Sequence, residues 1–308
     1  MKRIVLTGAT SMIGVALIQE CIENNIQVLA IVRSDSQNIR RIPKSELIDI
    51  VECNLENLKE VTFLKDKYDV FYHLAWDFTS RQYRDEPYRQ NKNVNYTLDA
   101  VNMASKLGCH TFVGAGSQAE YGGPAENDMS PETPIDANTA YGIAKYSAGK
   151  LSRLMCRNLG IKHIWTRIFS VYGPYDNSDT MIMYAINKFL VHERASFTKS
   201  EQMWDYLYCR DAAKALYLLG FKGKNGSVYC IGSGESYPLY DYIYKICNNI
   251  NKQLVVGLGD KKYAENQVMH LCADVTNLNR DTGFKPKYSF DEGIKLTIEW
   301  VKSQKRNV

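Results

Sequence analysis

Short apolar runs alternate with helical patterns through the first half of the chain. In the helical segments the apolar residues recur three and four positions apart, whereas the runs between them are almost continuously apolar. Such runs are typical of strands covered on both faces, and their alternation with helices predicts right-handed crossovers and a parallel sheet. We predict strands at 4–6, 28–32, 47–51, 70–74, 111–115 and 163–169, and helices at 15–22, 93–107 and 144–158.

The pattern changes after Phe169, where Tyr172-Gly173-Pro174 predicts a turn. A helix is expected at 181–191, and a strand–helix unit at 206–219 returns to the pattern of the first half. We therefore expect an α/β fold, a Rossmann-like doubly wound parallel sheet with a smaller interleaved α/β lobe. The sheet domain would comprise residues 1–174 and 205–233, and the second lobe residues 175–204 and 234–308, with a strand at 228–231 and a helix at 292–302.

A turn with two glycines, Thr7-Gly8-Ala9-Thr10-Ser11-Met12-Ile13-Gly14, joins the first predicted strand to the first helix. Backbone amides at the start of such a helix can bind a pyrophosphate, and Gly14 would let the helix pack closely on the sheet. Ser11 replaces the middle glycine of the usual fingerprint. The position of the turn favours a dinucleotide site over a plain helix-capping turn with Thr10 or Ser11 as the cap.

The end of the second strand indicates which dinucleotide binds. NAD sites usually carry a carboxylate there for the ribose 2′-hydroxyl, but this strand ends Val32-Arg33-Ser34. Arg33 could pair with a 2′-phosphate and Ser34 could donate a hydrogen bond to it, while Arg40 and Arg41 add positive charge. We therefore favour NADP(H) over NAD; the plainer interpretation of Arg33 is a solvated loop residue.

Tyr-x-x-x-Lys places a phenol and an ammonium group on one helix face. A nearby cation, together with an oxidised nicotinamide, can lower the pKa of a phenol from about 10 towards neutrality, which suits proton transfer at a carbinol or carbonyl carbon. Only Tyr141/Lys145 begins the helix after a strand that ends in a hydroxyl, Ser117, at the edge where ligands bind; Tyr146/Lys150 starts more than a turn deeper in the same helix. We predict these three as catalytic residues, with a structural helix-start aromatic as the alternative for Tyr141. The other three pairs are Tyr88/Lys92, Tyr146/Lys150 and Tyr184/Lys188.

Composition excludes several classes of protein. The 308 residues are 45% hydrophobic and 23% charged, which is typical of a globular fold. The net charge is only +4 without a Lys/Arg run, so we expect no nucleic-acid partner. No apolar stretch approaches the roughly 18–20 residues of a membrane span. The eight cysteines form no CxxC pair or Cys/His cluster, and we expect reduced thiols, no metal site and a cytoplasmic location.

Together these motifs resemble the extended short-chain dehydrogenases/reductases that act on nucleotide sugars, the NAD-dependent epimerase/dehydratase group. The resemblance extends over essentially the whole chain. It implies that the sheet domain binds NAD(P), that the second lobe binds a nucleotide sugar, and that two subunits pair through the helices at 93–107 and 144–158. It rests on residues 7–14, 54–55, 73–75, 93–95, Ser117, Tyr121-Gly122, 141–145, Arg167, 172–174, 205–208 and 231–234.

The resemblance also assigns roles to single residues. Tyr141 would be the acid/base, Ser117 would polarise the C4 oxygen of the sugar, and Lys145 would hold the nicotinamide ribose. With Arg33 and Ser34 included, the expected cofactor-binding residues are Gly8, Thr10, Ser11, Met12, Ile13, Gly14, Arg33, Ser34, Asn54, Leu55, Leu74, Ala75, Trp76, Asn93, Phe169 and Val171.

Departures from the patterns of the family narrow the reaction. The 4,6-dehydratases carry Asp-Glu after the catalytic hydroxyl residue, where this chain has Gln118-Ala119. The 3,5-epimerase/reductases carry a Cys and a His where this chain has Ala119 and Tyr175. This chain therefore lacks the usual acid and base both for elimination of water and for epimerisation beside a ketone.

The substrate side departs as well. Ser170 stands where many members have Asn, and Trp204 where many have Arg. The segment 202–206 resembles the CDP-abequose and CDP-paratose synthase branch, which reduces 4-keto-6-deoxy sugars. Trp204 would either stack on a base or fill the interface between the lobes. We take Gln118, Ser170, Tyr175 and Trp204 as candidate substrate-binding residues.

We expect an NADPH-dependent reductase of a nucleotide-linked 4-keto-(6-deoxy)hexose. The alternative is an NAD-dependent nucleotide-sugar 4-epimerase with the same three catalytic residues, against which the missing carboxylate beside Arg33 argues. A regulator that binds the cofactor without turnover is the third hypothesis, and the intact set of Ser117, Tyr141 and Lys145 argues against it.

Overall fold

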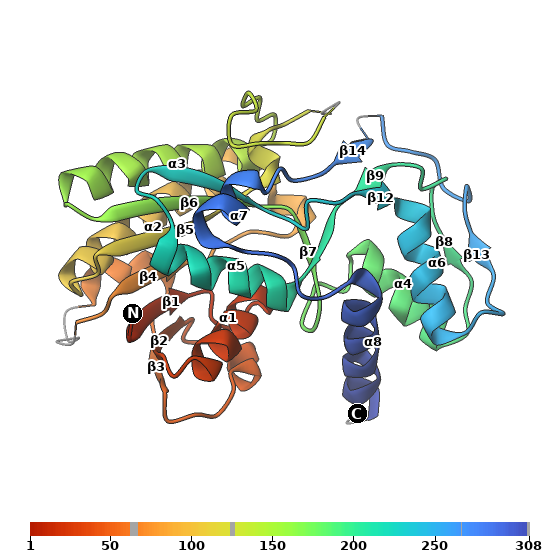
Figure 1. The fold of residues 1–308 in the computed structure, drawn as a ribbon, viewed down its shortest axis with the longest axis horizontal. Helices are drawn as coiled ribbons and strands as arrows, with labels where there is room; N and C mark the ends of the chain where they lie inside the picture. Colours follow the sequence, from red (N-terminus) through yellow and green to blue (C-terminus); the bar gives the residue numbers. More distant parts are fainter. Residues whose placement is uncertain (62–66, 124–126, 266, 307–308) are drawn as a thin grey trace.

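The computed structural model describes residues 1–61, 67–123, 127–265 and 267–306. Its larger part is built on a seven-stranded sheet in the order β11-β6-β5-β4-β1-β2-β3, in which all neighbours are parallel (Figure 1). This is the predicted doubly wound sheet. The strands are β1 (Arg3–Thr7), β2 (Gln27–Val32), β3 (Ile48–Glu52), β4 (Val70–His73), β5 (Thr111–Ser117), β6 (Lys162–Ile168) and β11 (Ser227–Ile231).

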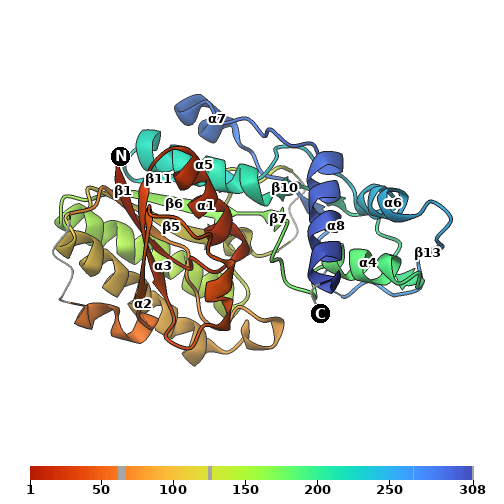
Figure 2. The same cartoon turned by 90° about the horizontal axis from the view of Figure 1, so that it is seen from below.

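Helices cover both faces of the sheet (Figure 2). α1 (Met12–Glu23) and α5 (Cys209–Lys222) pack together on one face, and α2 (Pro87–Lys106) and α3 (Ala140–Asn158) on the other. Alternate residues of each strand enter the two cores, so that Ile4 and Leu6 face α1 while Val5 faces α2. Burial on both faces explains why the strands are continuously apolar.

The order of strands reverses beside β1, which pairs with β2 on one side and β4 on the other. In such sheets ligands bind outside the carboxyl ends of the strands at the point of reversal. Thr7, at the end of β1, is in register with Ile31 and His73. The glycine turn therefore opens at the reversal point.

The second lobe is assembled from separated segments. Its helices are α4 (Met181–Leu190), α6 (Leu239–Ile250) and α8 (Phe290–Arg306). β9 (Met203–Trp204) lies between β12 (Tyr237–Pro238) and β14 (His270–Leu271), and β8 (Ala195–Ser196) pairs with β13 (Val256–Gly257). Between the two parts, β7 (Ser170–Tyr172) pairs with β10 (Tyr206–Tyr208).

α7 (Thr276–Thr282) packs against α5 and β11, beside the sheet. We therefore propose a two-domain division in which the expected segments are kept but residues 276–282 are counted with the sheet domain.

Two helices begin earlier than predicted. α3 starts at Ala140 rather than at 144, because the Thr139 hydroxyl accepts a hydrogen bond from Gly142 N at 3.1 Å and caps it. α2 starts at Pro87 rather than at 93, and proline suits the first helical position. The first turns carry polar or small side chains, so the apolar pattern begins later than the helix.

All eight cysteines are free, and seven of them are buried. The described residues also form the 3₁₀ helices η1 (Gln37–Arg41), η2 (Leu55–Glu60), η3 (Arg81–Tyr83) and η4 (Gln118–Glu120). Within the described ranges, no group of three His, Cys, Asp or Glu side chains could hold a metal ion. No helix in this part of the chain combines the length and apolar character needed to cross a bilayer.

Candidate active site

The glycine turn has the close packing that a dinucleotide site requires. Gly8 has φ +76°, and a Cβ there would lie 2.8 Å from Ala75 N. A Cβ on Gly14 would lie 2.1 Å from Gly8 O. Ser11 caps α1, since its hydroxyl donates to Gly8 O at 2.7 Å and accepts from Gly14 N at 3.1 Å. The residue that replaces the middle glycine therefore holds the turn itself, and both glycines are sterically required.

A cavity of about 380 Å³ lies outside the ends of β1, β2 and β4. Backbone of the glycine turn forms one wall and apolar residues after β4 form another, which fits a dinucleotide with a charged centre and a flat base. The predicted residues that line it are Gly8, Thr10, Ser11, Arg33, Leu55, Leu74, Ala75 and Trp76. The lining residues absent from the predicted set include Asn38, Arg41, Cys53, Asp77, Phe78 and Thr79.

The other predicted cofactor residues are not among those that line this cavity. Asn93 accepts from Asp77 N at 2.8 Å and donates to Asp77 O at 3.2 Å, and so holds the segment after β4. Asn54 accepts from Ser34 N at 3.3 Å. Of the remainder, Met12, Ile13 and Gly14 form the first turn of α1, Phe169 is buried beside Tyr121, and Val171 lies in β7.

Two arginines flank the cavity. Arg33 is exposed, and its charge opposes the effect of burial, which raises the pKa of Asp77. Arg41 is half-buried, donates to Thr10 O at 3.3 Å and lies 5.1 Å from the ring centroid of Tyr175. Arg41 therefore connects the glycine turn to the chain that leads into the second lobe. Its place in η1, several residues beyond β2, is why strand-end motifs did not single it out as a lining residue.

Ser117, Tyr141 and Lys145 meet where β5 ends and α3 begins. The Ser117 side chain lies beside the Tyr141 phenol and acts to lower its pKa. Tyr141 N donates to Arg84 O at 2.8 Å, which fixes the first turn of α3. Lys145 is buried, and its Nζ donates to Ala115 O at 2.6 Å. The structure thus brings the three predicted catalytic residues together.

Burial governs the electrostatics of this trio. It raises the pKa of the Tyr141 phenol, and the Arg84 guanidinium, 5.0 Å from the ring centroid, and the Ser117 side chain oppose that rise. Burial also lowers the pKa of Lys145 to about 7. The expectation that Lys145, together with an oxidised nicotinamide, lowers the pKa of the phenol stays a prediction. With a pKa of about 7 the desolvated amine is about half protonated at pH 7, and the charge that opposes the rise in the pKa of the phenol is that of Arg84.

Trp76 joins the cavity to the trio. It lines the cavity, and Lys145 Nζ lies 3.8 Å from its ring centroid. The Tyr141 ring meets it edge to face at 6.0 Å between centroids. Its Nε1 donates to Gln90 Oε1 at 2.9 Å, which fixes the indole. A dinucleotide in the cavity would therefore extend towards the phenol.

The family model described as the NAD dependent epimerase/dehydratase family matches residues 4–232. The chain belongs to this family. A Methanocaldococcus jannaschii protein with a provisional name as a UDP-glucose 4-epimerase is 28% identical over 98% of this chain and 99% of its own. A dTDP-glucose 4,6-dehydratase of Salmonella typhimurium is 24% identical over 97% and 92%. The solved UDP-glucose 4-epimerase of Thermotoga maritima shares the fold, with a TM-score of 0.85, 23% identity and coverage of 98% and 99%.

The motif-based assignment to the epimerase/dehydratase family is thus confirmed, and the protein is an enzyme of a family that acts on nucleotide sugars. The other Tyr-x-x-x-Lys pairs lie away from the cavity and from Ser117. Tyr88 is 91% exposed at the start of α2, Lys150 is exposed on α3 beside Tyr146, and Tyr184 lies in α4. The absence of a terminal hydroxyl on the preceding strand set aside Tyr88 and Tyr184, and the position of Tyr146 more than a turn into α3 set it aside.

The candidate substrate residues of this family member lie between the two parts. Trp204 Nε1 donates to Ser170 Oγ at 2.8 Å, and the half-buried indole packs between two apolar clusters. Tyr175 has φ +70° and its ring lies 4.9 Å from that of Trp300 in α8. Gln118 begins η4, directly after Ser117. Of the two interpretations of Trp204, its contacts favour packing at the junction.

Proposed function

We propose that this epimerase/dehydratase family member is an NADPH-dependent reductase of a nucleotide-linked 4-keto-(6-deoxy)hexose. The observation that carries the proposal is the Ser117 side chain beside the Tyr141 phenol, next to a cavity suited to a dinucleotide. A phenol held by a hydroxyl is a proton donor and acceptor for one oxygen atom.

In the proposed reaction, a nicotinamide bound in the cavity would supply the hydride for the carbonyl carbon. Tyr141 donates its proton to the C4 oxygen, and Ser117 hydrogen-bonds the same oxygen and orients it. The raised pKa of Tyr141 keeps the phenol protonated before transfer. Lys145 and the glycine turn would hold the ribose and pyrophosphate of the dinucleotide. Addition of hydride and proton converts the ketone to a secondary alcohol.

The same residues argue against elimination of water. A dehydratase needs an acid and a base beside the catalytic hydroxyl, and Gln118 and Ala119 provide neither. Glu120 is fully buried and paired with Arg167 at 3.0 Å, so its carboxylate is not available as the acid or base of an elimination. Hydride and proton transfer at C4 needs only the three residues that meet here.

A nucleotide-sugar 4-epimerase is the second candidate, and the names of the relatives favour it. Such an enzyme uses the same trio, and it must retain NAD through a cycle of oxidation and reduction at C4. No carboxylate stands at the end of β2 to favour NAD, since β2 ends at Val32 before Arg33 and Ser34. This position supports the reductase proposal.

The two candidates are separated by cofactor consumption. We expect oxidation of added NADPH with at least one member of a panel of CDP-, dTDP-, GDP- and UDP-linked 4-keto-6-deoxy sugars. Absorbance of the reduced nicotinamide measures it directly, with the corresponding 4-hydroxy sugars as controls. Protein that retains NAD during purification and interconverts UDP-hexoses without added cofactor would instead establish the epimerase.

We expect Arg33→Ala to weaken NADPH binding about 10-fold or more, because a charge-assisted bond to a phosphate contributes on the order of 1.5–3 kcal/mol. NADH has no 2′-phosphate, so its binding should change less than about 2-fold. Arg33 is exposed and makes no ion pair in the described part of the chain, so the substitution should leave the fold intact. Isothermal titration with both dinucleotides tests this. Equal affinities in wild type and variant would contradict the proposed preference.

We also propose a homodimer through α2 and α3. Neighbouring apolar side chains are exposed there, with Tyr88 at 91%, Ile143 at 52%, Leu151 at 42% and Leu154 at 48%. Such a patch is typical of an interface. We expect light scattering to give twice the mass of the chain, and Leu151→Glu with Leu154→Glu to give monomers. A wild-type monomer at micromolar concentration would refute this.

A further inference from the structure

A buried carboxylate lies directly behind Ser117. Glu120 is fully buried, and its Oε1 accepts from Ser117 N at 3.0 Å. Ser117 in turn accepts from Ala119 N at 3.2 Å through its hydroxyl, and the two bonds close a capping box around η4. The backbone and the side chain of Ser117 are therefore both fixed by this short turn.

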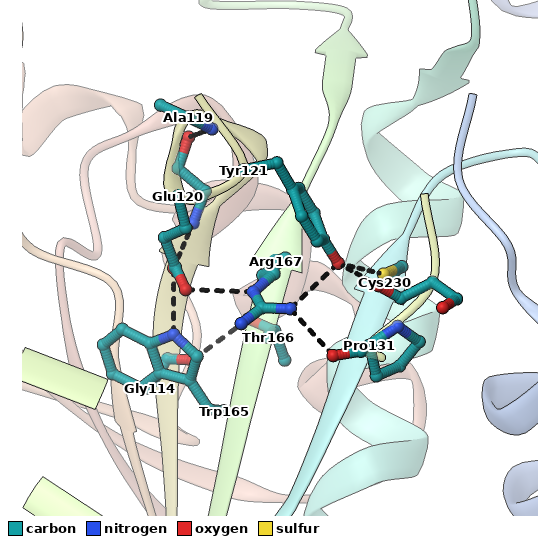
Figure 3. Close-up of polar contacts among 11 residues, drawn as sticks. Gly114, Ala119, Glu120, Tyr121, Pro131, Trp165, Thr166, Arg167 and Cys230 are labelled. Carbon is teal, nitrogen blue, oxygen red and sulfur yellow. Dashed lines mark hydrogen bonds and ion pairs between the residues drawn. The ribbon is translucent and has the colours of Figure 1, made fainter. Parts of the chain in front are cut away.

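The carboxylate is held on its other side by β6 (Figure 3). Trp165 Nε1 donates to Oε1 and Arg167 Nε donates to Oε2, each at 3.0 Å. Arg167 Nη1 also donates to Tyr121 OH at 3.0 Å and Pro131 O at 3.2 Å. Glu120 is thus anchored to β6, the neighbour of β5 in the sheet.

The turn that Glu120 anchors also packs against the start of α3. A Cβ on Gly142 would lie 2.3 Å from Ala119 O, so η4 and the first turn of α3 are in close contact. A Cβ on Gly116 would lie 2.2 Å from Glu120 Oε1, so the carboxylate reaches Ser117 only because glycine precedes it. The place of the Glu120 carboxylate therefore affects how Ser117 and Tyr141 meet.

A buried ion pair is weak evidence of a purely stabilising role, because the desolvation of both charges offsets most of their attraction. A well-packed apolar pair could fill the same space. An apolar pair could neither accept a hydrogen bond from Ser117 N nor place a negative charge beside the catalytic groups. Glu120 exerts such an influence, since it raises the pKa of both Lys145 and Tyr141.

We propose that Glu120 is a positioning residue of the active site: its carboxylate, anchored by Trp165 and Arg167, holds the Ser117 hydroxyl against the Tyr141 phenol. The inference rests on the proposed function, because it assigns Glu120 to the proton-transfer pair of that reaction. Glu120 contacts no substrate atom in this scheme, and acts through Ser117 and through its charge.

Glu120→Gln tests the proposal by kinetics. We expect kcat to fall about 10- to 100-fold with KM changed less than about 2-fold, because small misplacement of reacting groups slows chemistry more than it weakens binding. The charged and titratable groups that face Tyr141 and Lys145 are Arg84, Glu120 and His73. Loss of the negative charge should lower the pKa of both groups, and the alkaline limb of kcat/KM should move to lower pH by about half a unit or more.

A second variant keeps the test valid if Glu120→Gln folds poorly with Arg167 unpaired. Glu120→Gln combined with Arg167→Gln leaves no buried unpaired charge, and we expect the same loss of kcat. Glu132→Gln is the matched control, because Glu132 is exposed on the neighbouring loop. Full kcat in the double variant, or an unmoved alkaline limb in a folded Glu120→Gln, would overturn the proposal.

A readout without turnover separates this inference from the proposed function. Tyrosine labelled at Cζ reports the titration of Tyr141 by NMR, with Tyr141→Phe to assign its signal. A lower pKa of Tyr141 in Glu120→Gln, even if no 4-keto sugar is reduced, would support the influence of Glu120 and refute only the reaction. An unchanged pKa together with an active wild type would refute the role of Glu120 alone.

Discussion

Tyr141→Phe should lower kcat by about 10²- to 10⁴-fold while cofactor affinity changes less than about 2-fold. The phenol oxygen is the only part of Tyr141 that is lost, and it lies beside Ser117, while Tyr141 is not among the residues that line the dinucleotide cavity. The edge-to-face contact of the ring with Trp76 remains, so the wall beside Lys145 keeps its shape. Chemistry should therefore fail without a change in binding.

Tyr146→Phe supplies the control on the same helix, since Tyr146/Lys150 has the same spacing and lies away from Ser117. We expect its kcat to remain within about 2-fold of wild type. Turnover and dinucleotide titration on both variants complete the comparison. Full activity in Tyr141→Phe would remove Tyr141 from the mechanism, and equal losses in the two variants would point to a general effect on α3.

Lys145→Met should abolish turnover and yet stabilise the protein in the absence of dinucleotide by roughly 1–3 kcal/mol at pH 7. Burial lowers the pKa of Lys145 from 10.5 to about 7, and linkage makes this desolvated amine cost about 4 kcal/mol at pH 7. Methionine fills the same space without charge but leaves Ala115 O unpaired, which costs about 1–3 kcal/mol. The cost that is removed therefore exceeds the cost that is added, and the free energy of unfolding should be larger for the variant.

The sign of the pH dependence follows from the lowered pKa. Between pH 10.5 and pH 7 the unfolded chain takes up a proton at Lys145 that the folded protein does not, so wild-type stability falls as pH falls through this window. The advantage of Lys145→Met should therefore grow from pH 10 to pH 7 and then level off. Urea unfolding at several pH values measures it, with Lys150→Met, an exposed lysine of α3, as the control. A variant less stable than wild type at pH 7 would show that the amine is well solvated.

The sheet could be predicted because its physics is local and periodic. Continuous apolar runs such as Val28–Val32 need burial on both faces, and their alternation with helices leaves few topologies. The helix starts were less predictable, because Pro87 and Thr139 define them through backbone geometry rather than through an apolar face. The place of α7 beside β11 depends on tertiary packing that no local pattern contains.

The residues of the candidate site also differ in how well the sequence predicts them. Ser117, Tyr141 and Lys145 could be found because strand ends and a four-residue spacing bring them together. Arg41 was recognised only as added charge, since its contact with Thr10 depends on how the chain after β2 folds back. The lowered pKa of Lys145 could not be predicted for a related reason, because spacing shows that two groups are near but not how far either is desolvated.

Glu120 was the least predictable residue. A lone acidic residue between Ala119 and Tyr121 has no periodic or motif signal, and its partners Trp165 and Arg167 are more than forty positions away in the sequence. Only the pairing of β5 with β6 brings them together.

The position of β11 has a consequence for how the protein is made. Ser227–Ile231 forms one edge of the sheet by pairing with β6, whose residues precede it by more than sixty positions. During synthesis, β6 leaves the ribosome with an open edge while the intervening segments of the second lobe are still being added. At about 5–20 residues per second this edge stays open for several seconds. An unpaired, buried-type strand edge is a template for wrong pairing, so this interval is when the nascent chain is most exposed to aggregation and has most need of a chaperone.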